Sequence, residues 1–489
     1  MKKIFSILTI GSLALLTGCV NGDDDFNNNQ TQPYQVPAEL AFTNAQKELI
    51  DQMETPSVNL NVFRFFQHYL ATTIYRNDAR FNFTGTRKVP DNMWLALYTD
   101  VLGNLSEAKK IIPTEAKPAA LTQLAWDKQQ ANKLAIINIL EIYTYQVLVD
   151  SFGNVPYSEA AKVETTVLPK YDDAKTIYAD LINRLNALIP TLDTAYPSFE
   201  TGDNIYGGDV AEWITFANSL KLKIGINLAD VNPTLAKQTV ESAYNAGVLL
   251  TNSTNALFKY DGTSPNFNRL YAEVIASNRN DFVAEEGIVD AMNNLNDPRR
   301  PSYFTAVPGP GGGYVGGTVG LSNSYSTNSH IGESLLAPNK TGVLFDAAEV
   351  NFYLAEAASR GYSVGGTAAS YYNTAITESM AQWGVTGAAV TTYLADPNVV
   401  FSPANWKQRI GEQAWIAMYN RGFESWNFYR RLDYPVMTAP NATPAAEGKI
   451  PVRLTYPINE QTVNGSNWSQ ASSAIGGDKL TVKVFWDIN

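Results

Sequence analysis

Apolar residues at helical spacing are the feature that most restricts what this chain can fold into. Positions i, i+3, i+4 and i+7 share one face of an α-helix, so an apolar series with this spacing predicts an amphipathic helix. Three such series are Ile136, Ile139, Leu140, Tyr143 and Val147; Trp213, Phe216, Leu220, Ile224 and Leu228; and Val350, Tyr353, Leu354, Ala357 and Ala358. Lys221 and Lys223 are expected to point away from the second series. We therefore predict a mainly α fold.

The third series predicts the first helix of a hairpin. It is followed by Gly361, which can adopt the left-handed conformation at a helix C-terminus. A second series then follows, made of Tyr372, Ile376, Met380 and Trp383. Two short antiparallel helices with small residues at their crossing resemble a tetratricopeptide hairpin, although no strict repeat of about 34 residues runs along the chain. We expect a tetratricopeptide-like helical hairpin scaffold with long irregular loops and a few short strands.

Residues 259–339 depart from this helical pattern. The segment is rich in Gly, Pro, Ser, Asn and aromatic residues, and it has few apolar series beyond Glu286–Leu295. Loops of this length in a compact domain are usually functional. We expect a loop-rich functional excursion within a single domain of residues 37–489. Near the end of the chain, Leu480–Trp486 predicts a short strand.

The N-terminus has the pattern of a lipoprotein leader. Lys2 and Lys3 precede an apolar run, Ile4–Leu16, which is typical of a signal peptide and too short to span a bilayer. Thr17-Gly18 before Cys19, the only cysteine, resembles the bacterial lipoprotein box. Residues 1–18 are therefore predicted to be a signal peptide and Cys19 a lipidated residue. The alternative is a secreted protein with a free thiol.

Residues 19–36 are predicted to be a flexible tether. Their Asn, Gln, Thr and Asp content leaves too little apolar surface for folding. The triplet Asp23-Asp24-Asp25 is either a solvated run of charge or an acidic export signal, since it resembles the signal that sends some lipoproteins to the cell surface.

The charge of the chain argues against nucleic acid as a partner. The net charge is −11, and cleavage after residue 18 removes two lysines and no acid, which leaves −13. Binding to nucleic acid rests on neutralisation of phosphates by Lys and Arg. A single cysteine also excludes a disulfide scaffold and thiolate metal sites.

Catalytic motifs are weak in this sequence. Gly311, Gly313 and Gly316 match G-x-G-x-x-G, but no strand precedes them and no helix follows, so we interpret them as a loop. His68 is predicted to be a satisfied helical residue. Glu285 and Glu286 offer paired carboxylates as in glycosidases, but adjacent acids on a helix diverge by about 100°. We predict no enzyme activity, no catalytic residues, no cofactor and no metal.

Several stretches resemble one family. Arg409–Tyr419, Gly422–Trp426 and Arg430–Pro435 are similar to the signature of the SusD/RagB family. Further similar stretches, in the order of the family, are Asp150–Ala160, Trp213–Leu222, Asn296–Arg299, Glu349–Gly361, Arg453–Pro457 and Trp486–Asp487. Within the signature, Trp415, Tyr419, Phe423 and Trp426 lie at helical spacing and predict core positions. Arg430 and Arg431 are expected to pair with buried acids such as Glu424 or to cap helix carbonyls.

The resemblance implies a function for the whole chain. Members of this family are nutrient-binding lipoproteins anchored in the outer membrane and facing the cell exterior. They cover a TonB-dependent transporter of the SusC/RagA type. Family members bind oligosaccharides, or in some cases peptides, in a shallow site lined by aromatic and polar side chains. By this resemblance the chain is expected to capture glycans for uptake, with residues 259–339 as its ligand-binding excursion.

The site is expected among aromatic, Arg and His side chains in loops, which have no core to bury in. Two clusters meet this description, one between two helical segments and one in the 259–339 excursion. The candidates are Arg80, Phe81, Phe83 and Arg87 in the first cluster, and Phe267, Arg279, Tyr303, Tyr314, Tyr325 and His330 in the second. Two other function classes stay open, a surface glycoside hydrolase and a helical scaffold that binds proteins rather than nutrients.

Overall fold

The helices predicted from the three apolar series form, and each one buries its series. A computed structural model of the protein describes residues 37–83, 87–162, 165–309 and 312–489. The first series lies on α7 (Gln123–Phe152), the second on α9 (Val210–Asn227) and its cap, and the third on α13 (Ala347–Ser359). Aromatic members of the three series, such as Tyr143 and Trp213, are at most 1% exposed. The mainly α prediction is confirmed.

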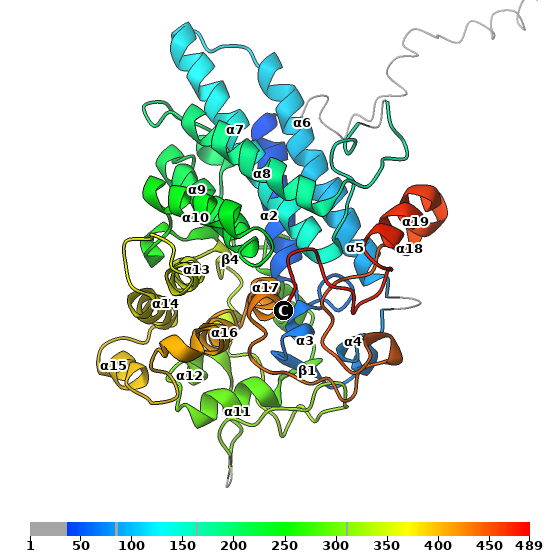
Figure 1. Cartoon of the computed structure of the whole chain (residues 1–489), viewed down its shortest axis with the longest axis vertical. Helices are drawn as coiled ribbons and strands as arrows, with labels where there is room; N and C mark the ends of the chain where they lie inside the picture. Colours follow the sequence, from blue (N-terminus) through cyan, green and yellow to red (C-terminus); the bar gives the residue numbers. More distant parts are fainter. Residues whose placement is uncertain (1–36, 84–86, 163–164, 310–311) are drawn as a thin grey trace, which may run out of the picture. The chain divides into compact units, whose positions relative to one another are not determined.

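Figure 1 shows the arrangement of the remaining helices and the strands in the described part of the chain. The other α-helices are α2 (Ala38–Glu54), α3 (Phe63–Phe66), α4 (Arg76–Ala79), α5 (Val89–Leu95), α6 (Gly103–Ile111), α8 (Ala174–Leu188), α10 (Pro233–Ala246), α11 (Glu286–Asn294), α12 (Arg300–Tyr303), α14 (Ala368–Gln382), α15 (Ala388–Leu394), α16 (Trp406–Ala417), α17 (Gly422–Leu432), α18 (Ile458–Val463) and α19 (Gly465–Ala474). Two π-helical segments are η1 (Ala96–Leu102) and η6 (Tyr271–Ala276). The strands are β1 (Leu70–Thr72), β2 (Ala256–Phe258), β3 (Phe282–Ala284) and β4 (Gly342–Phe345).

Consecutive helices pack in pairs, as the tetratricopeptide-like prediction requires. Helix α13 packs along α14, and α9 packs along α10. Gly361 follows α13 with φ of +79°, which is the left-handed conformation predicted for this turn. At the crossing of α9 with α10, a Cβ added to Gly225 would lie 2.9 Å from Cγ2 of Thr239. The absence of a side chain at Gly225 therefore allows these two helices to approach closely.

Two short antiparallel ribbons connect distant parts of the chain. β1 pairs with β3 so that Leu70 lies opposite Ala284 and Thr72 opposite Phe282. β2 pairs with β4 across more than 80 residues of sequence. The β1–β3 ribbon joins the loop-rich 259–339 excursion to the segment after α3, and the β2–β4 ribbon joins the two borders of the excursion to each other. They therefore set where the side chains of the excursion lie.

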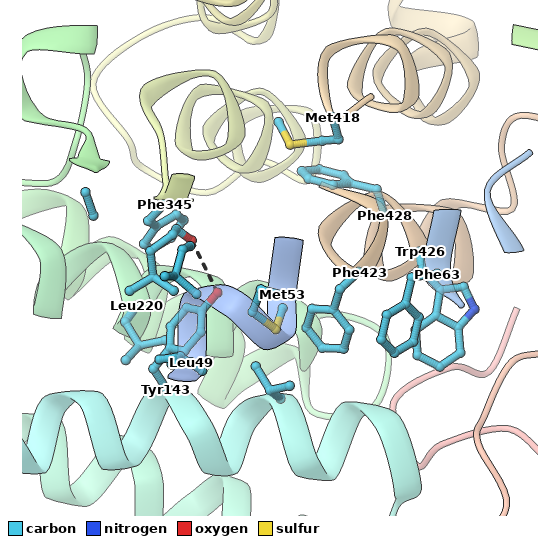
Figure 2. Packing of buried hydrophobic residues seen from close by; sticks show 14 of the residues in the cluster. Leu49, Met53, Phe63, Tyr143, Leu220, Phe345, Met418, Phe423, Trp426 and Phe428 are labelled. Carbon is cyan, nitrogen blue, oxygen red and sulfur yellow. Dashed lines mark hydrogen bonds between the residues drawn. The ribbon is translucent and has the colours of Figure 1, made fainter. Parts of the chain in front are cut away.

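The helically spaced aromatic residues of the family signature are buried, as the sequence predicts. The signature forms α16 and α17, and Trp415, Tyr419, Phe423 and Trp426 are each no more than 6% exposed. Figure 2 shows Phe423 and Trp426 beside Phe63, whose ring centre lies 5.0 Å from that of Trp426. These residues form part of the hydrophobic core rather than a surface for ligands.

The arginines of the signature also act inside the protein. The Arg430 guanidinium donates to the carbonyl oxygens of Asp150 and Val452, at 2.6 and 2.9 Å. Because Asp150 is in the last turn of α7, Arg430 caps that helix. Arg431 pairs with Glu356 at 2.9 Å, not with Glu424. The predicted capping and pairing are both found, with a different acid as the partner.

Lys223 points into the core, which the sequence did not indicate. Its side chain is 0% exposed, and its ammonium lies 3.2 Å from Glu349 and pairs with Glu424. It also lies 5.3 Å from the ring centres of Tyr143 and Phe345, both of which are labelled in Figure 2. A lysine beside an apolar series on a helix is usually solvated, but here the neighbouring helices supply two buried carboxylates.

Two smaller predictions are wrong. Leu480–Trp486 forms turns and irregular backbone instead of a strand, and the Trp486 indole is held by the Asp150 carboxylate at 2.8 Å. His68 follows α3 with φ of +51° instead of lying in a helix. The predicted signal peptide, Cys19 and the tether lie outside the described residues. Among the helices that are described, none combines the length and apolar character needed to cross a bilayer.

Candidate functional site

The β1–β3 ribbon brings residues from two distant loops together. Because the strands are antiparallel, residues after β1 lie beside residues before β3. Thr73 extends the pairing, since its N–H donates to the Asp281 carbonyl at 3.0 Å and its hydroxyl to the Asn280 carbonyl at 2.8 Å. The side chains of Tyr75 and Arg279 meet at this end of the ribbon, where Arg279 donates to the Tyr75 hydroxyl at 2.9 Å.

Tyr75 contacts two guanidinium groups. The Arg87 guanidinium carbon lies 5.0 Å from the centre of the Tyr75 ring, and that of Arg279 lies 5.9 Å from it. Both distances are within the range of cation–π attraction. Arg87 belongs to the first predicted cluster and Arg279 to the second, so Tyr75 is the residue that joins the two.

Buried carboxylates hold both arginines in place. Arg87 pairs with Asp78 at 3.1 Å, and Arg279 pairs with Asp281 at 3.1 Å. Burial raises the pKa of Asp78, and the charge of Arg87 acts against that rise. The Arg87 and Arg279 side chains keep 32% and 48% of their surfaces exposed. Each guanidinium is therefore oriented by an acid on one side and open to solvent on the other.

A hollow of about 180 Å³ lies beside Arg279. Phe282, Tyr325 and His330 line it together with residues of η6, and Phe282 also contacts Tyr75 at 6.4 Å between ring centres. The Tyr325 and His330 rings are stacked, with centres 3.5 Å apart and planes 8° from parallel. Nε2 of His330 hydrogen-bonds the Tyr325 carbonyl oxygen, which can only accept, so the proton is on Nε2.

The structure therefore assembles four predicted residues into one surface. We call it the Tyr75 face, made of Tyr75, Arg87, Arg279, Tyr325 and His330. It offers flat ring faces next to guanidinium N–H donors, with no buried nucleophile or acid–base pair among its members. This arrangement is suited to binding a ligand that has both apolar faces and hydrogen-bonding groups.

The rest of the first cluster lies elsewhere. Phe81 is 1% exposed and packs edge-on against Phe66 at 5.3 Å, so the expectation that it is an exposed loop aromatic is wrong. Phe83 is 7% exposed and lines a separate, larger cavity. Arg80 is half-buried beside Gly320, and its carbonyl oxygen accepts the N–H of Thr443 at 2.9 Å.

The other three residues of the second cluster also lie outside the Tyr75 face. Tyr303 is 0% exposed, stacks on Tyr419 and donates its hydroxyl to the Ile416 carbonyl at 3.0 Å. The expectation of an exposed ring is wrong for Tyr303 because α12 carries it into the core. Tyr314 is half-buried and lies 5.6 Å below the guanidinium of Arg300. Phe267 is half-buried against Tyr271, at 4.9 Å between ring centres.

Sequence reasoning missed Tyr75. The residue follows Leu70-Ala71-Thr72-Thr73-Ile74, a run rich in β-branched residues that favours a strand over a helix. If that run is interpreted as a strand, Tyr75 follows it in a loop. Aromatic residues in loops are the ones expected to bind the ligand, so Tyr75 would then be a candidate. The pairing with β3 has no sequence signal, so the contact with Arg279 was not predictable.

The carboxylate pair Glu285–Glu286 divides into a buried and an exposed member. Glu285 is 2% exposed, and its carboxylate accepts the N–H of Gly287 at 2.6 Å as the N-cap of α11. Burial raises its pKa to about 8. Glu286 is exposed and accepts the Thr318 hydroxyl at 2.9 Å. The first acid therefore has a structural role at a helix terminus.

Comparisons with known proteins identify the family. A family model described as SusD-like, starch-binding and associating with the outer membrane, matches residues 28–457. A comparison with curated proteins gave no match.

Solved structures are similar over most of the chain. A SusD homologue from Bacteroides uniformis is 28% identical with a TM-score of 0.76, covering 92% of this chain and 99% of the homologue. A structure described as a chitin-binding protein is 25% identical with a TM-score of 0.78, covering 92% and 100%. A chitin-binding SusD homologue from Flavobacterium johnsoniae is 23% identical with a TM-score of 0.77, covering 92% and 99%, and shows the shared fold. The helical scaffold, the buried signature and the match over residues 28–457 together show that the chain belongs to the SusD/RagB family.

Proposed function

We propose that this protein binds oligosaccharides at the Tyr75 face and passes them to a transporter. The observation that carries the binding proposal is the Tyr75 ring flanked by Arg87 and Arg279, 5.0 and 5.9 Å from its centre, next to the stacked Tyr325–His330 pair. Pyranose rings have apolar C–H faces that stack on flat aromatic rings. Their hydroxyl groups accept hydrogen bonds from guanidinium N–H groups.

The relatives favour glycans over peptides as the ligand. The description of the family model names starch, and one similar structure is described as a chitin-binding protein. Starch and chitin are both polymers of pyranose units, which is the shape that the half-buried rings of the Tyr75 face suit. A peptide ligand is the alternative, and it is included as a probe below.

The proposal extends to the place and partner of the protein. The lipoprotein box at Cys19 supports anchoring by lipid in the outer membrane, and Asp23-Asp24-Asp25 supports export to the cell exterior. A SusC/RagA-type TonB-dependent transporter is the proposed recipient of the glycan. The predicted tether of residues 19–36 would keep the folded body near that transporter and raise its effective concentration there.

Binding at the Tyr75 face is tested by calorimetric titration with maltohexaose, chitohexaose and a mixture of short peptides. We expect Tyr75→Ala and Arg279→Ala to weaken binding of a hexasaccharide by about tenfold or more, since tenfold is about 1.4 kcal/mol and each change removes a contact group. Tyr314→Ala and Arg269→Ala are the matched controls, because these residues lie in the same excursion, outside the face. They should bind as the wild type does.

Two results would contradict the proposal. One is binding of peptides without binding of either hexasaccharide. The other is a hexasaccharide that binds wild type, Tyr75→Ala and Arg279→Ala with equal affinity, which would place the site elsewhere on the protein.

A further inference from the structure

A larger cavity lies away from the Tyr75 face. Its volume is about 500 Å³, against about 180 Å³ for the hollow beside Arg279. It is bordered by the segment at Phe83, the start of α5, η9 (Pro444–Ala446), α18 and the turn around Leu480, and it is open to solvent on one side. Ligand sites in proteins are usually about 300–1,000 Å³, mostly apolar, with a few polar groups. This cavity has that size.

The floor of the cavity is apolar and firmly packed. Phe83, Tyr456 and Leu480 are each no more than 7% exposed. Phe83 packs on Phe66 at 5.9 Å between ring centres, and the Tyr456 hydroxyl donates to the Asn154 carbonyl at 2.9 Å. Phe83 and Tyr456 are therefore held in place by contacts with Phe66 and Asn154, which do not line the cavity.

The walls are fixed as well. Asp91 at the start of α5 accepts the N–H groups of Ile458 and Asn459 at 3.1 and 3.0 Å, which caps α18. Asp478 accepts the N–H of Tyr456 at 2.9 Å and pairs with Arg453. Both carboxylates of the walls are therefore already used to join the surrounding segments.

The rim of the cavity carries polar side chains that do not join the surrounding segments to one another. Glu447, Gln461 and Lys479 line the cavity and are exposed. Within the described ranges, their side chains make no hydrogen bond or ion pair. They supply one acid, one amide and one ammonium, so these three exposed groups together carry no net charge, whereas among the described residues the wall carboxylate of Asp91 is held by backbone N–H groups alone. The rim therefore offers both hydrogen-bond donors and hydrogen-bond acceptors above an apolar floor.

We infer that this cavity is a second carbohydrate site, which takes a neutral sugar unit. A charged ligand would lose hydration over the apolar floor without a matching excess of charge at the rim. A neutral sugar places an apolar face or an acyl group on the floor and its hydroxyl groups at the rim. The inference rests on the proposed function for the class of ligand, and it assigns that ligand a second binding site, separate from the Tyr75 face.

The two sites share one segment of chain. Phe83 lines the cavity, and Arg87, four residues later, contacts Tyr75. The first cluster predicted from sequence is therefore divided between the two sites. A glycan that is long enough to occupy both sites is expected to bind more tightly than a single sugar unit, because the second contact then forms within the same complex.

The test measures hydrogen–deuterium exchange of the full chain with and without maltohexaose or chitohexaose. In the wild type, we expect slower exchange in peptides covering residues 441–463 and, separately, in peptides covering residues 270–282. The double variant Gln461→Ala/Lys479→Ala should lose protection over 441–463 alone. Gln470→Ala/Lys449→Ala, an exposed pair of the same residue types outside the cavity, should keep it.

The variant Tyr75→Ala separates this inference from the proposed function. It should lose protection over 270–282 and retain it over 441–463. Protection only over 270–282 in the wild type would overturn the second site and leave the Tyr75 face supported. Protection only over 441–463 would support the cavity and overturn the Tyr75 face. No protection in either region by either hexasaccharide would overturn both.

Ala445→Phe gives a second way to test the cavity. Ala445 lines the cavity and is exposed, so a larger side chain there occupies space at the mouth without entering the core. We expect it to abolish protection over 441–463 while the melting temperature stays close to that of the wild type. Unchanged protection in a folded Ala445→Phe protein would contradict the inference.

Discussion

At the scale of single residues, the centre of this scaffold contains buried charged side chains that pair with one another. Lys223 pairs with Glu424 and lies 3.2 Å from Glu349, which also pairs with Arg421. The side chains of Lys223 and the two acids are at most 3% exposed. Removing one partner from a buried ion pair leaves an uncompensated charge. The resulting decrease in the free energy of unfolding should be larger than the decrease caused by removing any exposed ion pair of the same protein.

We expect Lys223→Met to lower the free energy of unfolding by about 3–5 kcal/mol, measured by urea denaturation. Lys221→Met is the matched control, since Lys221 lies two residues away on α9 and makes no ion pair among the described residues. It should change the free energy by less than about 1 kcal/mol. Equal effects of the two substitutions would show that the charge network is not what stabilises this region.

Glu285 should make stability fall as the pH rises. Burial raises its pKa from 4.5 to about 8, so between these values the folded protein holds a proton that the unfolded chain releases. His68, whose Nδ1 lies 3.6 Å from the carboxyl, has its pKa lowered to about 4 by burial and stays neutral in this range. The stabilising proton is present below pH 4.5 and is lost as the pH approaches 8.

Glu285→Gln keeps the oxygen that caps α11 and removes the titration. The wild type should lose about 1–3 kcal/mol more stability than this variant between pH 5 and pH 8.5, by urea denaturation at each pH. Parallel stability curves for the two proteins would contradict this assignment.

At the scale of elements, two helical glycines have opposite roles. Gly225 lies where α9 crosses α10, and an added Cβ would sit 2.9 Å from Cγ2 of Thr239. Gly103, at the start of α6, has its nearest neighbour to an added Cβ at 3.6 Å, which is an ordinary contact. One glycine is required by packing, whereas the other only weakens its helix.

We expect Gly225→Ala to lower the melting temperature, because overpacking costs about 1–3 kcal/mol. Gly103→Ala should raise it, since alanine is favoured over glycine in a helix by about 0.5–1 kcal/mol. Calorimetric melting of both variants checks this pair. A stabilised Gly225→Ala protein would mean that the two helices do not approach as closely as the structure shows.

At the scale of the whole molecule, the proposed lipid anchor and the binding sites are separable. A Cys19→Ala variant should lose labelling by a fatty-acid probe, because the thiol is the proposed site of lipid attachment. Glycan affinity of the purified variant should equal that of the wild type, while uptake by cells should fall because the protein is no longer held near its transporter. Retained labelling would reject lipidation at Cys19.

The sequence was sufficient for the helical class and for the family, for a physical reason. Series such as Ile136–Val147 and the helical aromatic residues Trp415, Phe423 and Trp426 are buried through local periodicity, so their positions on a helix follow from spacing alone. Gly361 is similar, because its left-handed conformation depends only on the turn it ends.

The candidate site was decided by tertiary structure. Arg87 and Arg279 meet only because β1 pairs with β3 and Tyr75 lies at the end of that ribbon. Tyr325 and His330 lie beside Arg279 because their segment also packs on β3, where the Ala284 N–H donates to the Ser329 carbonyl at 2.7 Å. Burial separated Phe81 and Tyr303 from the half-buried loop aromatics, because Phe81 packs on Phe66 of α3 and Tyr303 stacks on Tyr419, which is distant in the sequence. Periodicity specifies which face of an element is buried, whereas contacts between loops depend on the path of the whole chain, which no local pattern contains.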